Sequence, residues 1–375
     1  MTVEIIGGGP AGLYFAILAK RRFPEWNIHV TERNGRNDTF GWGVVFSDRT
    51  LDKLKEHDPT SAETIIDNFE VWENVEVVHK NEHIFIGGNR FSGISRLVML
   101  NILQDRAESL GVNLTFNKEV RDLDEVAAAD LVIVADGVNS FFRKKYPAYF
   151  EPDLSIRSNK YIWYGTNQLF NALTLTLREN ADGIFASHSY KFNETTSTFV
   201  VECDPETWRK AGFESMNDAE TRSYLETVFA DDLGGHPLLS NKSTWINFLL
   251  VKNKKWVHDN IVIIGDAAAT AHFSIGSGTK LALEEAIALF HSFENHHDIK
   301  EALTNYETTH KPIVEEYQQL AYDSLLLFEN LKDIRDLAPI EMAYKMMTRS
   351  KRLDHEKLRK RDPEFVKRVE EFRSK

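Results

Sequence analysis

The segment that most constrains the fold is GGGPAG, which follows a short apolar stretch at residues 3–6 and precedes a helical pattern at residues 13–22. Its glycines Gly7, Gly9 and Gly12 have the G-x-G-x-x-G spacing. In such a turn the first glycine permits a tight bend, the second lets the backbone approach a pyrophosphate, and the third lets the helix pack closely on the strand. We therefore expect a strand, a phosphate-binding turn and a helix whose N-terminus faces an anion.

An acidic residue completes this unit. A second apolar strand is expected at residues 28–31, and Glu32 follows it, about 20 residues after Gly12. At this place a carboxylate accepts hydrogen bonds from ribose hydroxyls. These features together predict a βαβ unit that binds a dinucleotide, either NAD or FAD, and the expected cofactor-binding set includes the neighbouring Pro10, Ala11 and Arg33.

Two later segments favour the longer cofactor. Asp136 and Gly137 follow an apolar strand at residues 131–135, and the segment GDAAATAHFSIGSGTKLALEEA follows another at residues 260–264. The second segment contains a loop with two close glycines and then a helix, and a helix that starts in this way exposes unpaired N–H groups and a partial positive charge. An NAD dehydrogenase has no evident need for these further turns, whereas a long cofactor that runs across the fold does. The sequence therefore favours FAD.

The composition argues against a nucleic-acid-binding protein, a disulfide-stabilised protein and a membrane protein. The chain has 375 residues, of which 42% are hydrophobic, and a formal net charge of −12. It is long enough for a sizeable core, and it lacks the general basicity of a nucleic-acid-binding protein. Its single cysteine, Cys203, excludes an intramolecular disulfide and a C-x-x-C redox pair. Because no apolar run approaches the ~18 residues of a membrane span and no signal-peptide pattern is visible, we expect a cytoplasmic protein with neither membrane nor nucleic-acid partners.

Strand-like segments rich in aromatic and β-branched residues, such as YIWYGTNQL, FASHSYKF and TSTFVVEC, interrupt the dinucleotide-type pattern. Residues 345–375 hold twelve Lys or Arg against six Asp or Glu, which indicates either a solvated helical face or a patch for a phosphate-bearing ligand. We predict an α/β fold with a discontinuous Rossmann-like FAD-binding domain at residues 1–68, 92–155 and 255–330, an inserted β-rich substrate domain at residues 69–91 and 156–254, and a helical, basic C-terminal segment at residues 331–375.

The glycine fingerprint, the central DG and the late GD, in this order, resemble the motifs of the flavoprotein aromatic hydroxylases of the para-hydroxybenzoate hydroxylase type. The resemblance covers most of the chain and implies that fold, FAD as the cofactor and NAD(P)H as its reductant. It implies that Arg96 and Gln104 reach the ribityl and phosphate region of the flavin and that Asp266 meets the ribityl chain. It further implies that the helix starting near Gly278 points its N-terminus at the N1–C2 edge of the flavin, where reduced flavin is negative. The implied cofactor-binding set is completed by Val120, Asp136, Gly137, Gly276, Thr279 and Lys280.

A closer resemblance rests on the segments DTFGWGVVFSDRTL, NKYIWYGT, STFVVE, AHFSIGSGTKLALEEAIAL and TRSKRLDHEKLRKRDP. Together they resemble the aryl-CoA hydroxylases, namely salicylyl-CoA 5-hydroxylase and the monooxygenase half of 2-aminobenzoyl-CoA monooxygenase/reductase, and the core segments also resemble the indole-oxidising VioD of the violacein pathway. The resemblance implies a monooxygenase that uses molecular oxygen to hydroxylate an electron-rich aromatic ring, with an aryl-CoA thioester as the expected substrate. The alternatives that stay open are a free aromatic or indolic substrate and, with less support, a flavin reductase or binding flavoprotein that does not hydroxylate.

A base beside the ring would help a phenol or aniline substrate lose its proton. The candidates are His272, in the loop before the glycine pair, and His188 and Tyr190, in FASHSYKF.

Aromatic and basic residues are the candidates for holding the substrate. Trp42, by analogy with the family, is expected near the flavin, and Trp163 and Tyr164 are expected to line an aromatic pocket. The phosphates of a CoA ester would need charge-assisted contacts, for which the basic tail offers Arg349, Lys351 and Arg352.

Overall fold

The computed structural model describes residues 1–375, and its first layer is a six-stranded sheet with the order β16-β17-β9-β1-β2-β8. All neighbouring strands are parallel except β16 and β17, as expected when βαβ units build a sheet. The strands of this sheet are β1 (Thr2–Ile6), β2 (Asn27–Thr31), β8 (Asn113–Thr115), β9 (Leu131–Val134), β16 (Val257–His258) and β17 (Ile261–Ile263).

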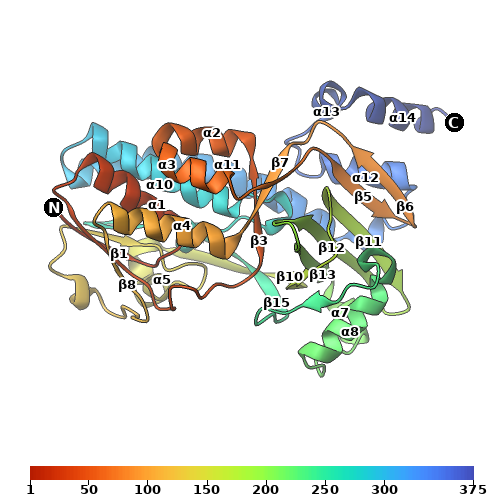
Figure 1. Cartoon of the computed structure of the whole chain (residues 1–375), viewed down its shortest axis with the longest axis horizontal. Helices are drawn as coiled ribbons and strands as arrows, with labels where there is room; N and C mark the ends of the chain where they lie inside the picture. Colours follow the sequence, from red (N-terminus) through yellow and green to blue (C-terminus); the bar gives the residue numbers. More distant parts are fainter.

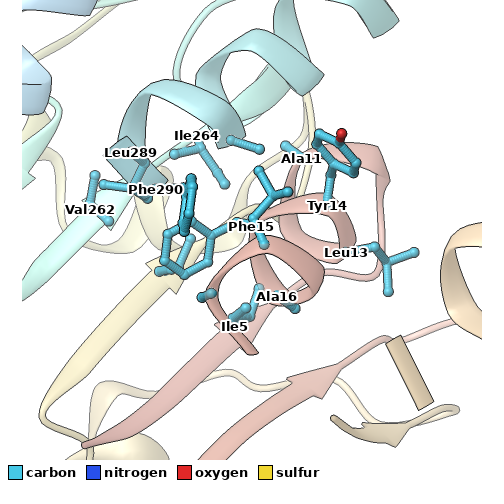
Figure 2. Close-up of a cluster of buried hydrophobic side chains, with 14 of the residues drawn as sticks. Ile5, Ala11, Leu13, Tyr14, Phe15, Ala16, Val262, Ile264, Leu289 and Phe290 are labelled. Atoms are coloured by element: carbon cyan, nitrogen blue, oxygen red, sulfur yellow. The ribbon is translucent and has the colours of Figure 1, made fainter. Parts of the chain in front are cut away.

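Three helices pack together over this sheet: α1 (Pro10–Arg22), α4 (Arg96–Ser109) and α10 (Gly278–Asn295) (Figure 1). Because α1 contacts both of the other helices and also β1 and β2, its residues from Pro10 to Ala19 are all buried, and this part of its sequence is apolar on every side. Figure 2 shows Phe15 of α1 facing Phe290 of α10, with Val262 of β17 beside them. This packing fixes the start of α1 relative to the start of α10.

A buried carboxylate ties two further helices, α2 (Asp48–His57) and α3 (Pro59–Ile66), to this layer. Asp58 is fully buried and receives hydrogen bonds from both Nε and Nη2 of Arg106 in α4, at 3.1 and 3.0 Å, while Arg21 of α1 lies 3.1 Å away. Burial alone would raise the pKa of Asp58, but the hydrogen bonds from Arg106 and Ser61 hold it below its usual range. The carboxylate is therefore ionised at neutral pH and paired with two guanidinium groups.

Asp58→Asn should destabilise the fold by about 3 kcal/mol, because it removes the fully buried anion that pairs with the partly exposed guanidinium groups of Arg21 and Arg106. The measurement is urea denaturation at pH 7. Since the pKa of Asp58 is lowered in the folded state, its contribution is present above about pH 4 and is lost as the pH falls further. Asp105→Asn, at an exposed carboxylate on α4 that pairs with Arg36, is the control and should cost less than about 1 kcal/mol. Equal effects of the two variants would contradict this account.

The second layer is an eight-stranded sheet with the order β14-β10-β13-β12-β11-β5-β6, in which β15 also pairs with β10 (Figure 1). A smaller sheet of β3, β7 and β4 runs between the two large ones. The strands are β3 (Gly43–Ser47), β4 (Glu70–Trp72), β5 (Val75–His79), β6 (Glu82–Ile86), β7 (Phe91–Ser95), β10 (Pro152–Thr166), β11 (Leu173–Asn180), β12 (Gly183–Lys191), β13 (Ser197–Cys203), β14 (Leu238–Leu239) and β15 (Ile246–Asn253).

One face of the eight-stranded sheet packs on the helices α7 (Pro205–Lys210), α8 (Asp218–Val228) and α9 (Ala230–Leu233). Because side chains alternate along a strand, Ile162 and Tyr164 of β10 belong to that core, whereas Tyr161 and Trp163 lie on the other face. The register places Tyr161 opposite Glu202 and Trp163 opposite Val200. This other face is the one that turns toward the loop before α10.

The C-terminal part is helical, as predicted, and consists of α11 (Ile299–Glu329), α12 (Pro339–Thr348), α13 (His355–Arg361) and α14 (Pro363–Arg373). Helices α12 and α14 bury Met342, Met346 and Val369 against β5 and β6, so most of the basic residues of this segment lie on its outer side. Short helices α5 (Phe141–Lys145) and α6 (Pro147–Phe150) follow β9. None of the helices combines the length and apolar character needed to cross a bilayer. The domain boundaries drawn from the sequence stay a prediction.

Candidate active site

The turn between β1 and α1 is shaped by backbone contacts that only glycine permits. Gly7 has φ +110°, and a Cβ there would lie 2.2 Å from the Ala135 carbonyl oxygen. A Cβ on Gly12 would lie 2.6 Å from the Gly7 oxygen, so helix and strand are in close contact. A Cβ on Gly9, in contrast, would meet nothing within 4 Å, and no side chain caps the first N–H groups of α1. Open space in front of free N–H groups fits a pyrophosphate.

Glu32 stands at the end of β2, where its carboxylate is held by the turn. Its Oε2 accepts a hydrogen bond from the Gly8 N–H at 2.7 Å, and Oε1 accepts one from the Asn34 N–H at 2.8 Å. Arg33, by contrast, lies on the surface 4.0 Å from Glu119. Val120 is buried, as are Pro10 and Ala11 at the start of α1.

Arg96, at the start of α4, and Asp266, in the segment after β17, lie close enough for the charge of each to affect the other. Burial lowers the pKa of Arg96 and raises that of Asp266, while the opposite charge of each partly offsets the effect on the other. Asp266 is nevertheless exposed to solvent, so a ligand can reach it. Further along α4, Gln104 is buried, and its Oε1 has no hydrogen-bond partner. These groups fit the ribityl and phosphate part of a flavin nucleotide.

The DG and GD segments are joined by a buried arginine. Asp136 follows β9, and its Oδ2 accepts a hydrogen bond from the Phe141 N–H at 2.7 Å, whereas its Oδ1 is buried without a partner. Gly137 has φ +81°. Arg143, fully buried, donates to the Ala267 carbonyl at 2.8 Å and so connects the two segments. The orphaned Oδ1 is a second polar atom that a bound cofactor could satisfy.

The start of α10 is free of side-chain caps. Gly276 has φ +61°, Ser277 makes no capping hydrogen bond, and a Cβ on Gly278 would meet nothing within 4 Å. The N–H groups of Gly278 and Thr279, in the first turn of α10, therefore have no side-chain acceptor. Lys280 turns away, because its Nζ donates to Glu284 at 2.6 Å and lies 3.9 Å from the centre of the Tyr317 ring.

Two tryptophans join the cofactor side to the eight-stranded sheet. A Cβ on Gly41 would lie 2.5 Å from the Trp163 ring, and a Cβ on Gly165 would lie 2.7 Å from the Trp42 ring. Each indole thus packs on a glycine of the other segment. Tyr164, expected beside Trp163, instead lies on the opposite face, where its hydroxyl donates to Asp218 Oδ1 at 3.0 Å. Strand alternation separates these two neighbours.

His188 projects from the same sheet face as Trp163 and is bound to a buried carboxylate. Its Nε2 lies 2.7 Å from Glu202 Oε1, and Asn159 donates to Glu202 Oε2 at 3.3 Å. Burial alone would raise the pKa of Glu202, but the hydrogen bond from His188 and its charge bring that pKa below its usual value. No protein group bonds to His188 Nδ1. A carboxylate that orients an imidazole with one free nitrogen is the arrangement of a general base.

His272 and Tyr190 are placed differently. His272 is buried, and its Nδ1 is 2.8 Å from Ser274 Oγ. Burial lowers the pKa of His272 to about 4, against the opposing effect of Glu202, so the ring is neutral at pH 7. The Tyr190 hydroxyl donates to the Gly43 carbonyl at 2.8 Å, and burial raises the pKa of Tyr190. Tyr190 is therefore held as a structural donor between β12 and β3.

The three basic candidates of the tail separate in space. Arg349 reaches inward, where Nη2 donates to the Ser274 carbonyl at 2.6 Å. Lys351 is 79% exposed and pairs with Asp323 at 3.1 Å. Arg352 lies 5.7 Å from the centre of the Tyr317 ring and has no carboxylate partner. Only the last two remain on the surface, so Arg349 belongs to a different environment from the one expected.

Sequence reasoning missed Glu202 and Tyr161. The Tyr161 ring lies 4.7 Å from the Phe273 ring, and burial raises the pKa of Tyr161 to about 12, with the charges of Asp266 and Glu202 adding to the effect. Tyr161 therefore lies between Asp266, on the side of the cofactor-binding candidates, and Glu202, on the sheet face. The available signal was the acidic Glu202 within the otherwise apolar and hydroxylated strand STFVVEC.

Comparison with known proteins agrees with this geometry. A family model described as FAD binding domain matches residues 1–321. The chain belongs to this family. Salicyloyl-CoA 5-hydroxylase of a Streptomyces species is 41% identical over 381 residues, which cover 99% of this chain and 73% of the relative. Protodeoxyviolaceinate monooxygenase of Chromobacterium violaceum is 33% identical, covering 94% of this chain and 95% of the relative. The protein is an FAD-dependent monooxygenase, and the resemblance drawn from its motifs is confirmed.

Solved structures share the fold. The tetrameric form of 2-methyl-3-hydroxypyridine-5-carboxylic acid oxygenase superposes with a TM-score of 0.72 at 20% identity, covering 88% of this chain and 92% of that chain. Pseudomonas aeruginosa PqsL in complex with 2-aminobenzoylacetate gives a TM-score of 0.70 at 18% identity, covering 89% and 98%. The predicted fold class is thereby confirmed.

Proposed function

We propose that this monooxygenase hydroxylates the aromatic ring of an aryl-CoA thioester. The observation that carries the proposal is the alignment with salicyloyl-CoA 5-hydroxylase, which covers 99% of this chain and 73% of the relative at 41% identity. A further relative, 3-hydroxy-4-methyl-anthranilyl-[aryl-carrier protein] 5-monooxygenase of Streptosporangium sibiricum, is 32% identical, and its name also describes an aryl group carried on a larger molecule. A free indolic or aromatic substrate is the second candidate, favoured by the likeness to protodeoxyviolaceinate monooxygenase.

FAD, reduced by NAD(P)H, supplies the activation of molecular oxygen for transfer to the ring. In our proposal the β1–α1 turn holds the pyrophosphate, Glu32 the adenosine ribose, and Arg96 and Asp266 the ribityl and phosphate region. The N–H groups that open α10 stabilise negative charge on the flavin through direct hydrogen bonds and the helix dipole. The aromatic face of Tyr161 and Trp163 excludes water and orients the ring.

His188 is our candidate for the group that takes a proton from the hydroxyl or amino substituent of the substrate. Its Nδ1 is free, and Glu202 holds the ring at Nε2 and stabilises the imidazolium that results. His272 stays neutral at pH 7, which suits a hydrogen-bonding role beside the ring rather than storage of a proton. The substrate thus becomes more electron-rich where it is attacked.

The CoA part of the substrate needs cations that are not already neutralised. Arg352 has no carboxylate partner, and Arg361 Nη1 bonds only to the neutral Asn89 side chain, at 2.6 Å. Burial and the positive charge of Arg352 both lower the pKa of Arg361, so the two guanidinium groups are neighbours. Two close, uncompensated guanidinium groups form a natural site for phosphates.

The experiment that tests the proposed function measures NAD(P)H consumption by the FAD-loaded protein with salicylyl-CoA, 2-aminobenzoyl-CoA and the two free acids. Product mass is measured in parallel, because uncoupled turnover yields peroxide. We expect stimulation and a gain of one oxygen atom with a thioester and not with its free acid. Hydroxylation of free aromatics or indoles alone would replace the proposal with its second candidate.

The double variant Arg352→Gln, Arg361→Gln should raise the KM for an aryl-CoA at least about 100-fold, because each of the two lost charge-assisted contacts is worth roughly 1.5–3 kcal/mol. Its kcat should change little. The KM for an aryl-pantetheine thioester, which lacks the nucleotide phosphates, should stay the same. The exposed Arg368, on α14, gives the control variant Arg368→Gln. An unchanged KM for the CoA ester in the double variant would rule out this phosphate site.

A further inference from the structure

The loop between the GD segment and α10 lies outside every sheet, yet it sets the place where α10 begins. Within it, a short 3-10 turn at Phe273–Ile275 is capped by His272, and Gly276 then reverses the chain with φ +61°. Backbone hydrogen bonds within residues 272–276 join only near neighbours, such as Gly276 N–H to the Phe273 carbonyl at 2.9 Å, and the loop's backbone bond to another element lies earlier, from Thr270 N–H to the Val251 carbonyl at 3.2 Å. The position of residues 272–276 relative to the C-terminal helices therefore depends on side chains.

Those side chains converge on Ser274. Its Oγ lies 2.8 Å from His272 Nδ1 and 2.8 Å from the Oγ of Ser324, which belongs to α11. Arg349, at the end of α12, donates through Nε to Ser324 Oγ at 2.9 Å and through Nη2 to the Ser274 carbonyl at 2.6 Å. A third donor, Nη1, bonds to the Met346 carbonyl in its own helix. One guanidinium group thus connects the loop, α11 and α12.

We propose that Arg349 is a positioning residue that locks the 272–276 loop onto the C-terminal helices and thereby places the N-terminus of α10. The role in placing the flavin rests on the proposed position of the cofactor at α10. The guanidinium suits this task because its planar fork offers donors in fixed directions, which a lysine cannot reproduce.

The environment of the Arg349 guanidinium strengthens its hydrogen bonds to Ser274 and Ser324. Arg349 is half-buried, and the centre of the Phe328 ring lies 5.7 Å from its guanidinium carbon. Burial lowers the pKa of Arg349 to about 10, with the Glu202 charge opposing the shift, so the group is still cationic at pH 7. Charge-assisted hydrogen bonds in a low-dielectric setting exceed ordinary ones in strength. The C-terminal segment therefore contributes directly to the order of the site.

The test is hydrogen exchange of backbone amides in Arg349→Met and Arg349→Lys, with and without FAD. We expect exchange of the amides at 272–278 in the FAD-free protein to accelerate about tenfold or more in Arg349→Met and less in Arg349→Lys, with other segments unchanged. Ser324→Ala, which removes one partner, should give a smaller increase at the same amides. Lys345→Ala, at an exposed residue of α12, is the control and should change nothing.

The loosened loop should also weaken FAD binding about tenfold and raise the fraction of NAD(P)H that yields peroxide. Unchanged exchange at 272–278 in a folded Arg349→Met, or acceleration spread evenly over the whole chain, would overturn the proposal. Local acceleration with unchanged FAD affinity and coupling would overturn the link between the loop and the flavin. The substrate assay with wild-type protein is independent of all these outcomes, so a failure of the proposed function is seen separately.

Discussion

Gly9→Val should abolish FAD binding while the apoprotein stays folded. The Gly9 backbone has ordinary φ and ψ of −79° and 176°, and a Cβ there would meet nothing within 4 Å. The side chain would instead fill the space that the pyrophosphate needs. We expect the Kd for FAD to rise at least about 100-fold, or ~2.7 kcal/mol, while the free energy of unfolding of the apoprotein changes by less than about 1 kcal/mol. Flavin fluorescence titration and urea denaturation give the two quantities.

Gly12→Val provides the contrast, because its side chain would enter an occupied place. A Cβ on Gly12 would lie 2.6 Å from the Gly7 oxygen and 2.9 Å from Ile5 Cγ2. Overpacking at this backbone contact should cost several kcal/mol and remove both fold and cofactor. If Gly9→Val bound FAD normally, the pyrophosphate would not lie over this turn, and the placement of the whole cofactor would be wrong.

Glu202→Gln should lower the rate of hydroxylation about 100-fold and leave reduction of the bound flavin by NAD(P)H unchanged. The amide is nearly isosteric, but it cannot stabilise the imidazolium that forms when His188 takes a proton, and general-base catalysis is typically worth 10²–10⁴-fold. Hydroxylation and reduction are followed separately, as product formed and as loss of the flavin absorbance under anaerobic conditions.

The hydrogen bond with His188 lowers the pKa of Glu202, so this carboxylate is ionised at neutral pH. Glu202→Gln therefore removes a negative charge that the wild-type site carries under assay conditions.

A matched control exists in the same sheet. Glu76 bonds to His83 at 2.8 Å, in a pair of which His83 is exposed, and Glu76→Gln should leave both rates unchanged. A Glu202→Gln enzyme that hydroxylates at the wild-type rate would remove His188 and Glu202 from the chemistry.

The cofactor-binding part of the fold could be predicted from the sequence because short motifs define it. The spacing of Gly7, Gly9 and Gly12 is a short-range pattern, and the strands that flank it are short apolar runs with clear ends, even though the carbonyl that Gly7 must accommodate belongs to the distant Ala135. The order of the three motifs then indicated a flavin monooxygenase, which the family match confirms. Such motifs can be recognised without any knowledge of tertiary packing.

The substrate half depends on packing between distant segments, which a sequence does not display. Tyr164 follows Trp163 directly, yet the pleat sends the two rings to opposite faces of β10. Arg349 stands in a basic run typical of solvated helices, but the end of α12 aims it at Ser274, 75 residues earlier in the chain. Glu202 became a candidate only when the pairing of β12 with β13 brought it beside His188.

The crystal structure of the FAD-loaded protein tests the central claim most directly, namely that one site joins the start of α10 to the sheet face carrying Tyr161 and His188. We predict the pyrophosphate over Gly9, the N1–C2 edge of the flavin at the N–H groups of Gly278 and Thr279, and the flavin ring facing Tyr161. A flavin ring bound away from α10, or separated by protein from the face with His188, would contradict the account.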